Sequence, residues 1–362
     1  MPVWPIEYRG ADPFGSPVMP ELSAIDACRI LCQAKKEGLI THTSFHDDDL
    51  VPWNPNALMD IVVDPNCEAV KTLQEIKEMF DEVGLKANTV TCNLHANPIF
   101  RRGGLTNPDP AVRTLARHKV ERTLHIGNLF GAKYFTYWVA RDGFEVAWGV
   151  SWRDVYGWII EALNHVYRYQ RSHRFSYEGG TIEPKPNEPR GHMFIPTAGH
   201  AVGLIQELNY PSFWGVNPEL RQHEAMTLID PITTLGYLLS LNKLFFLHFG
   251  NQINGQFDND FPPMVGPEGQ KETIQMFWLL QQFGWQGVIE FDCHALRSEL
   301  DPEDPAGCKM RFIQNCRNAL DMALALAEKI PDPAYGIPHK GDSDLDLRLT
   351  AILHGRDPND LR

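Results

Sequence analysis

The chain has 362 residues, enough for one large α/β barrel or for two ordinary domains. Its 33 lysines and arginines against 46 aspartates and glutamates give a net charge of −13. This balance argues against a nucleic-acid binder held by phosphate contacts, and it suits a site that concentrates cations. The sequence contains no apolar run approaching about 18 residues, so no membrane span is expected.

The cysteines and the first residues bear on the compartment. The seven cysteines do not show the paired CxxC spacing of a zinc site, and we interpret them as reduced thiols. The opening MPVWPIEYRG lacks the basic start and the apolar run of a secretory signal. Together these features predict a cytoplasmic protein.

Short apolar runs typical of β-strands alternate with longer amphipathic segments over most of the chain. Strands are expected at residues 3–8, 39–46, 85–94, 133–140, 181–186, 212–219, 243–250 and 287–292. Helices are expected at residues 21–37, 67–83, 109–130, 152–171, 197–208, 231–241, 272–283 and 305–329. This alternation predicts an α/β fold, a (β/α)8 TIM barrel over residues 1–330. Residues 331–362 are polar and rich in Pro and Gly, so we expect an extended C-terminal arm over the barrel or over a neighbouring subunit.

The segment 181–192, TIEPKPNEPRGH, places a carboxylate, an ammonium and an amide on alternate residues of an expected strand. Because side chains of a strand alternate between its faces, Glu183, Lys185 and Asn187 should point the same way. A Glu and a Lys on one buried face are costly unless they are paired or meet a metal or a substrate. A solvated edge strand is the alternative, because proline within a sheet is usually confined to such positions.

Polar side chains follow the expected strands at their C-terminal ends, where barrel enzymes build their sites. Taken singly, they have ordinary explanations: residues 258–260 would be a solvated turn, and a lone His223 or His248 would be structural. Gathered at one mouth, the carboxylates would repel one another strongly without cations, and they could neutralise two divalent ions. The candidate residues at these strand ends are His46, Asp49, Glu183, Lys185, Glu219, His223, His248, Asp258, Asp260 and Asp292.

Over residues 1–330 the sequence resembles the D-xylose (glucose) isomerase family. The matching stretches are FHDDDLVP at 45–52, TIEPKPNEPRG at 181–191, GVNPE at 215–219, NGQFDND at 254–260 and EFD at 290–292. The resemblance implies two divalent ions, usually Mg²⁺, Mn²⁺ or Co²⁺, and interconversion of an aldose with its ketose by a metal-assisted hydride shift. It implies D-xylose and D-xylulose first as the substrate pair, with D-glucose and D-fructose beside it.

Roles are carried over from the resemblance at matching positions of this chain. His46 matches the ring-opening histidine, and Asp49 matches the carboxylate that orients it. Lys185 matches the lysine that hydrogen-bonds the carbonyl end of the sugar. The implied metal ligands are Glu183, Glu219 and Asp292 for a structural ion, with Glu219 bridging, and Asp258 and Asp260 for a catalytic ion.

The resemblance also implies the walls of the sugar pocket and an assembly. Trp4 and Trp138 match aromatic walls that exclude water. Phe14, in the stretch ADPFG, matches a phenylalanine that a neighbouring subunit contributes. The expected assembly is therefore a homotetramer whose partners complete one another's pockets.

The chain departs from the family pattern at four histidines. His248 replaces the remaining aspartate ligand of the structural ion, and His223 follows Glu219 by four residues where the family's histidine follows by three. His95 replaces a pocket phenylalanine, and His294 replaces a lysine. We expect the additional residue before His223 to bulge if this histidine is to bind metal, and we place His95 and His294 in the substrate pocket.

Replacing an aspartate ligand with His248 should change the charge and the metal preference of the ion site. A neutral imidazole lowers the negative charge of the ion site by one and shifts its preference from Mg²⁺ toward Mn²⁺, Co²⁺, Ni²⁺ or Zn²⁺. We expect one ring nitrogen to bind the ion while the other donates to a nearby acceptor. Alternatively, His248 turns aside and one ion binds. The chain could also be a paralogue acting on another sugar or modified polyol, as isomerase, epimerase or lyase, or a metal-binding barrel that has lost catalysis.

Overall fold

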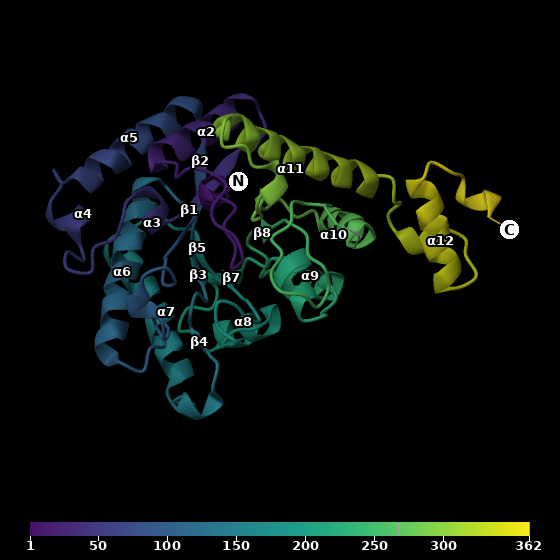
Figure 1. Cartoon of the computed structure of the whole chain (residues 1–362). Coiled ribbons are helices and arrows are strands. Elements are labelled where there is room, and N and C mark those ends of the chain that lie inside the picture. The colour runs from purple at the N-terminus through teal and green to yellow at the C-terminus, as the bar shows by residue number, and fades with distance from the viewer. Residues whose placement is uncertain (267, 362) are drawn as a thin grey trace.

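Parallel strands form the wall of a barrel in the computed structural model, which describes residues 1–266 and 268–361 (Figure 1). Five strands are hydrogen-bonded in the order β1, β2, β3, β5, β7, and β8 pairs with β9. Bridges from Val216 to Leu244 and from Glu219 to His248 join β7 to that pair. These strands are β1 (His42–His46), β2 (Lys86–Thr91), β3 (Tyr134–Trp138), β5 (Gly179–Glu183), β7 (Trp214–Val216), β8 (Leu247–His248) and β9 (Ile289–Glu290).

Long helices follow the strands and surround the wall (Figure 1). Several of them begin at an Asp-Pro pair, because the Asp side chain accepts a first-turn amide and proline fits the first helical position. The alternation confirms the predicted TIM barrel. The surrounding helices are α2 (Ala24–Lys36), α5 (Glu68–Val83), α6 (Pro110–Leu129), α7 (Val155–Ser172), α8 (Ala198–Gln206), α9 (Pro231–Ser240), α10 (Gln270–Gln282) and α11 (Pro305–Ala327).

The prediction of a first strand at residues 3–8 is wrong. The chain there forms the short helix α1 (Trp4–Glu7), because Pro5 cannot donate to a strand ladder and favours the first turn of a helix. The chain start still lies against β1. The amide of Val3 donates to the carbonyl of Ser44 at 2.9 Å, and the amino group of Met1 donates to the carbonyl of His42 at 3.3 Å.

The strands also end earlier than the sequence predicts. β5 stops at Glu183, before the prolines at 184 and 186, which have no amide hydrogen to donate. The amide of Lys185 instead donates to the carbonyl of Ile195 at 3.1 Å, so this residue is fixed by a loop contact. The strict alternation of faces therefore does not extend from Glu183 to Asn187.

Short elements shape the loops at the barrel mouth. α3 (Asp47–Leu50) starts directly after β1, and α4 (Asp60–Val63) follows it. β4 (Gly143–Phe144) and β6 (His192–Met193) pair antiparallel. After β7, residues Leu220–Glu224 form a π-helical turn. A π turn accommodates one more residue than an α turn, so it supplies the bulge that the spacing of His223 demands.

The last helix, α12 (Asp342–Leu353), lies beyond the far end of α11 and away from the barrel wall (Figure 1). An ion pair between Lys271 of α10 and Asp346 of α12 connects it to the barrel. In the described part of the chain, the helices are too short or too polar to cross a membrane.

Candidate active and metal site

A cavity of about 320 Å³ opens at the end of the barrel where the strands finish. Its wall includes the last residue of four strands: His46 of β1, Thr91 of β2, Trp138 of β3 and Glu183 of β5. The lining residues are Trp4, His46, Asp49, Thr91, Asn93, His95, Trp138, Glu183, Lys185, Glu219, His223, Asp258, Asp260, Asp292 and His294.

The structure therefore brings the predicted site residues to one cavity, with two exceptions, His248 and Phe14. His248 is buried among the lining carboxylates. Sequence reasoning missed Thr91 and Asn93. Their position at the end of an expected strand is the signal that could have identified them.

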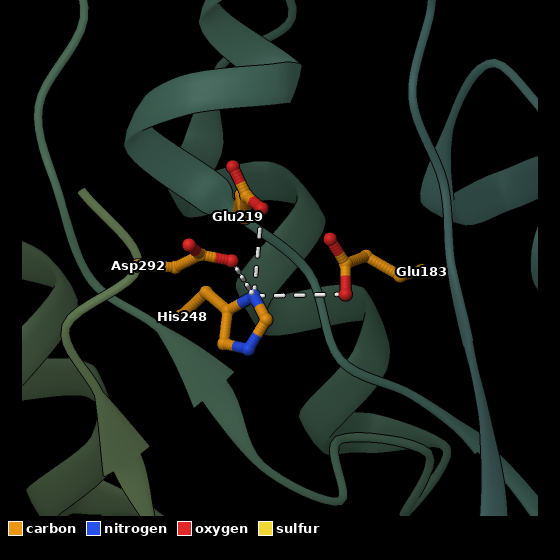
Figure 2. Close-up of side chains that lie close together, drawn as sticks. All are labelled: Glu183, Glu219, His248 and Asp292. Atoms are coloured by element: carbon orange, nitrogen blue, oxygen red, sulfur yellow. Dashed lines mark ion pairs between the residues drawn. The ribbon is translucent and has the colours of Figure 1, made fainter. Parts of the chain in front are cut away.

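Three carboxylates converge on one nitrogen of His248 (Figure 2). Nδ1 of His248 lies 3.0 Å from Oδ2 of Asp292, 3.4 Å from Oε1 of Glu219 and 3.6 Å from Oε2 of Glu183. The four candidate ligand atoms all lie within 4.8 Å of one another. The side chains come from the ends of β5 and β8 and from the loops that follow β7 and β9.

The residues present fit a divalent cation. Both ring nitrogens of His248 and Oε2 of Glu219 are buried without a hydrogen-bond partner among the described residues. Buried polar atoms are normally paired, so such a group indicates a site for an ion. One imidazole with three carboxylates is a donor set of the kind that binds divalent transition ions.

The electrostatics of the cluster reflect its excess of negative charge. Burial disfavours the charged imidazole, but Glu183 and Asp292 hold the pKa of His248 well above its ordinary value. Burial and the neighbouring Asp292 raise the pKa of Glu219 well above its usual range. A divalent ion would relieve the repulsion that produces both shifts.

Residues around the cluster hold its carboxylates in place. Nδ2 of Asn217 donates to Oε2 of Glu183 at 2.6 Å, and Nε1 of Trp4 donates to Oδ1 of Asp292 at 2.6 Å. Such outer contacts orient metal ligands. Asn217 was missed from the sequence, although it lies within the GVNPE stretch.

A second group of polar side chains shares Glu219. Nε2 of His223 lies 3.1 Å from Oε2 of Glu219 and 3.6 Å from Oδ2 of Asp258. The π-helical turn therefore points His223 toward the carboxylates despite the additional residue. Its Nδ1 lies 2.8 Å from the carbonyl of Pro184, which fixes the ring.

In this second group, side chains of the protein already contact the carboxylates. Nζ of Lys185 donates to Oδ2 of Asp258 at 2.5 Å. Burial opposes ionisation of Asp258, yet Lys185 and His223 hold its pKa below the usual range. Asp260 accepts from Nε2 of Gln222 at 3.0 Å and lies 3.2 Å from Nδ1 of His294.

The cavity wall also carries a histidine and its carboxylate, His46 and Asp49. Asp49 accepts from the amide of His46 at 2.6 Å, and its Oδ2 lies 3.2 Å from Nδ1 of that ring. Burial lowers the pKa of His46, but nearby carboxylates, Asp49 above all, together outweigh this effect and raise it. The ring of Trp4 packs 4.5 Å from that of His46. Position and protonation of His46 are thus both set by its neighbours.

His95 brings a polar atom into the aromatic wall. Its ring packs edge-on against Trp138 with 4.9 Å between centroids, and 5.4 Å from His46. Nδ1 of His95 is buried without a hydrogen-bond partner in the described residues. Burial lowers the pKa of His95 well below its ordinary value, so the ring is neutral.

The comparison with known proteins agrees with this geometry. A family model described as xylose isomerase-like TIM barrel matches residues 39–316. A xylose isomerase from Thermus thermophilus is 34% identical over 297 residues, which cover 82% of this chain and 72% of that protein. The chain belongs to the xylose isomerase-like TIM barrel family.

Solved structures of similar fold include an L-ribulose 3-epimerase, with a TM-score of 0.61 and 13% identity over 93% of this chain and 98% of that one. Another is the IOLI protein with a bound zinc atom, with a TM-score of 0.59 and 13% identity over 82% of this chain and 92% of that one. At these identities the likeness concerns the xylose isomerase-like fold.

Phe14, which the family resemblance assigns to a neighbouring pocket, does not line the cavity of its own chain. Its side chain is 99% exposed in a turn where Asp12 and Gly15 pair. An aromatic ring so exposed is available to a partner. Its role in a second subunit stays a prediction.

Proposed function

We propose that this member of the xylose isomerase-like family is a metal-dependent sugar isomerase that interconverts an aldose and its ketose. The observation that carries the proposal is the lining of one cavity. An oriented histidine, His46, shares this cavity with Lys185 and with two groups of candidate ligands joined by Glu219. The xylose isomerase of Thermus thermophilus supports D-xylose as the first substrate to test. D-glucose, which the family resemblance implies beside it, is the second.

The proposed roles follow from the contacts of each side chain. Asp49 occupies Nδ1 of His46, so the other ring nitrogen is available to move a proton at the ring oxygen of a closed sugar. Burial lowers the pKa of Lys185, but the carboxylates of Asp258, Asp260 and Glu219 together outweigh this and raise it, so the ammonium stays charged and can donate to a carbonyl oxygen. Trp4 and Trp138 exclude water from the open-chain substrate.

Two divalent ions are proposed, with Mg²⁺, Mn²⁺ or Co²⁺ as candidates. Glu183, Glu219, His248 and Asp292 would hold the first. When bound, the ions would draw electron density from adjacent sugar oxygens. The imidazole ligand favours Mn²⁺ or Co²⁺ over Mg²⁺. The second ion would be held by Glu219, His223, Asp258 and Asp260.

A single-ion epimerase is the second candidate. The first group gathers its ligand atoms within 4.8 Å, whereas Asp258 is bound by Lys185, and Asp260 is contacted by His294. A site that keeps those pairs would hold one ion. The isomerase and the epimerase differ in which carbon of the sugar loses its hydrogen.

One assay separates the candidates. Metal-stripped protein is supplied with Mg²⁺, Mn²⁺, Co²⁺ or Zn²⁺ and tested against a panel of aldopentoses, aldohexoses and ketoses. The proposal expects the ketose to form from an aldose, fastest with Mn²⁺ or Co²⁺. Ketose epimers without any aldose conversion would favour the single-ion epimerase.

We also propose a homotetramer in which Phe14 of the partner subunit closes the sugar pocket. The exposed ring of Phe14 and the polar sequence of the segment after α11 support this arrangement. Light scattering at micromolar concentration tests it. A monomer in solution would contradict the assembly and leave the pocket open on one side.

A further inference from the structure

A fourth buried carboxylate, Glu290, lies on the far side of His248. The two residues are partners in the register of β8 and β9. Oε2 of Glu290 is 3.5 Å from Nε2 of His248, the nitrogen that Figure 2 shows on the opposite side of the ring from the three ligand carboxylates. Nδ1 of His248 therefore faces the three ligand carboxylates, and Nε2 faces Glu290.

Glu290 is fixed by one of its oxygens and open at the other. Its side chain is 0% exposed. Oε1 accepts from Oγ of Ser44 at 2.6 Å, and that hydroxyl accepts from the amide of Thr89 at 3.1 Å. Oε2 has no hydrogen-bond partner in the described residues. The carboxylate is thus held against the barrel wall with a free acceptor directed toward His248.

The contact between Glu290 and His248 changes the charge around the ion site. Relative to an aspartate ligand, His248 lowers the negative charge next to the ion by one. Glu290 returns that charge on the far side of the ring. A carboxylate that accepts from Nε2–H fixes the tautomer with a lone pair on Nδ1 and makes the imidazole a stronger donor.

We infer that Glu290 is a positioning residue, which holds Nε2–H of His248 so that Nδ1 binds the cation beside Glu183, Glu219 and Asp292. The inference rests on the metal site of the proposed function. Glu290 and His248 then act as one unit in place of a single carboxylate ligand. If Glu290 were only structural, replacing it would instead change metal binding equally whichever residue occupies position 248.

A double-mutant cycle on the full chain tests this difference. Wild type, Glu290→Gln, His248→Asp and the double variant are stripped of metal and titrated with Mn²⁺ by calorimetry, without sugar. Gln keeps the volume and an acceptor for Ser44 but removes the charge. Glu290→Gln should weaken Mn²⁺ binding about 10- to 100-fold when His248 is present. In the His248→Asp background the same change should alter binding by less than about twofold.

Equal losses in both backgrounds would overturn the inference. Thermal unfolding in chelator shows whether each variant is folded. If Glu290→Gln does not fold, Ser44→Ala leaves the carboxylate in place but loosens it, and it should weaken Mn²⁺ binding only when His248 is present. Wild type that binds no Mn²⁺ would remove both the inference and the metal site. Wild type that binds Mn²⁺ but converts no sugar would contradict only the proposed reaction.

Discussion

The barrel buries two ionic clusters that differ in how their charges are balanced. In the first, Nζ of Lys119 contacts Asp47 at 2.6 Å and Asp48 at 3.0 Å, and Arg122 contacts Asp47 at 3.5 Å. The side chains of Asp47, Lys119 and Arg122 are all 0% exposed. The second is the group around His248, where three carboxylates face one imidazole.

The two clusters differ in whether the protein itself neutralises their carboxylates. Asp47 is paired with Lys119 and accepts from the amide of Asn93 at 2.9 Å, so its charge is balanced by side chains of the protein, although Nη1 of Arg122 lacks a hydrogen-bond partner in the described residues. Around His248, both ring nitrogens and Oε2 of Glu219 have no hydrogen-bond partner in the described residues. The first cluster therefore balances its own charges, whereas the second has an excess of carboxylates that suits a cation.

Breaking the balanced cluster should have the largest effect. Lys119→Met leaves Asp47 buried beside a weaker partner and should lower the free energy of unfolding by about 3–5 kcal/mol. Urea unfolding measures this loss. Lys77→Met, which removes an ion pair with Asp81 at the surface, is the matched control and should cost less than about 1 kcal/mol. Equal losses would mean that the buried cluster is not structural.

Lys185→Met should affect chemistry more than folding. Loss of this donor should lower kcat about 10²- to 10³-fold. The variant should still bind Mn²⁺, because a divalent ion can neutralise Asp258 in place of the ammonium. Steady-state kinetics, with calorimetry for the metal, measure both properties. Wild-type turnover by this variant would show that Lys185 does not contact the reacting sugar.

Metal binding should weaken as the pH falls, because the ion and a proton compete for the same nitrogen of His248. Although burial disfavours its charge, Glu183 and Asp292 raise the pKa of His248, so the metal-free ring holds a proton that the ion must displace. Mn²⁺ affinity should therefore fall up to about tenfold per pH unit below that raised pKa and level off above it. Titration calorimetry across pH tests this. Affinity independent of pH would exclude His248 as a ligand.

The smallest effect is expected at His95. His95 lines the cavity and its Nδ1 lacks a hydrogen-bond partner in the described residues, so we expect the ring to turn and accept from a sugar hydroxyl. His95→Phe should lower kcat/KM about twofold to tenfold for the sugar that makes this hydrogen bond. Substrates without that hydroxyl provide the control, since their kcat/KM should be unchanged. A uniform loss across substrates would indicate a change in packing against Trp138.

The barrel and most of the residues that line the cavity could be predicted from the sequence. Alternating apolar periods predicted eight helices around parallel strands, and strand-end positions predicted residues such as Glu183 and Asp292 at one mouth. These features depend on local patterns, because each strand carries its last side chains to the same end of the barrel. The roles of the metal and substrate residues stay predictions.

The contacts between distant segments became visible in the folded structure. Residues 4–7 form a helix within a segment where a strand was expected, and a π turn carries His223 to Glu219. Glu290 lies against His248, although nothing in the sequence distinguishes this residue from other strand carboxylates. A sequence pattern gives the face and period of each element, but the partner across the barrel depends on register between strands far apart in the chain.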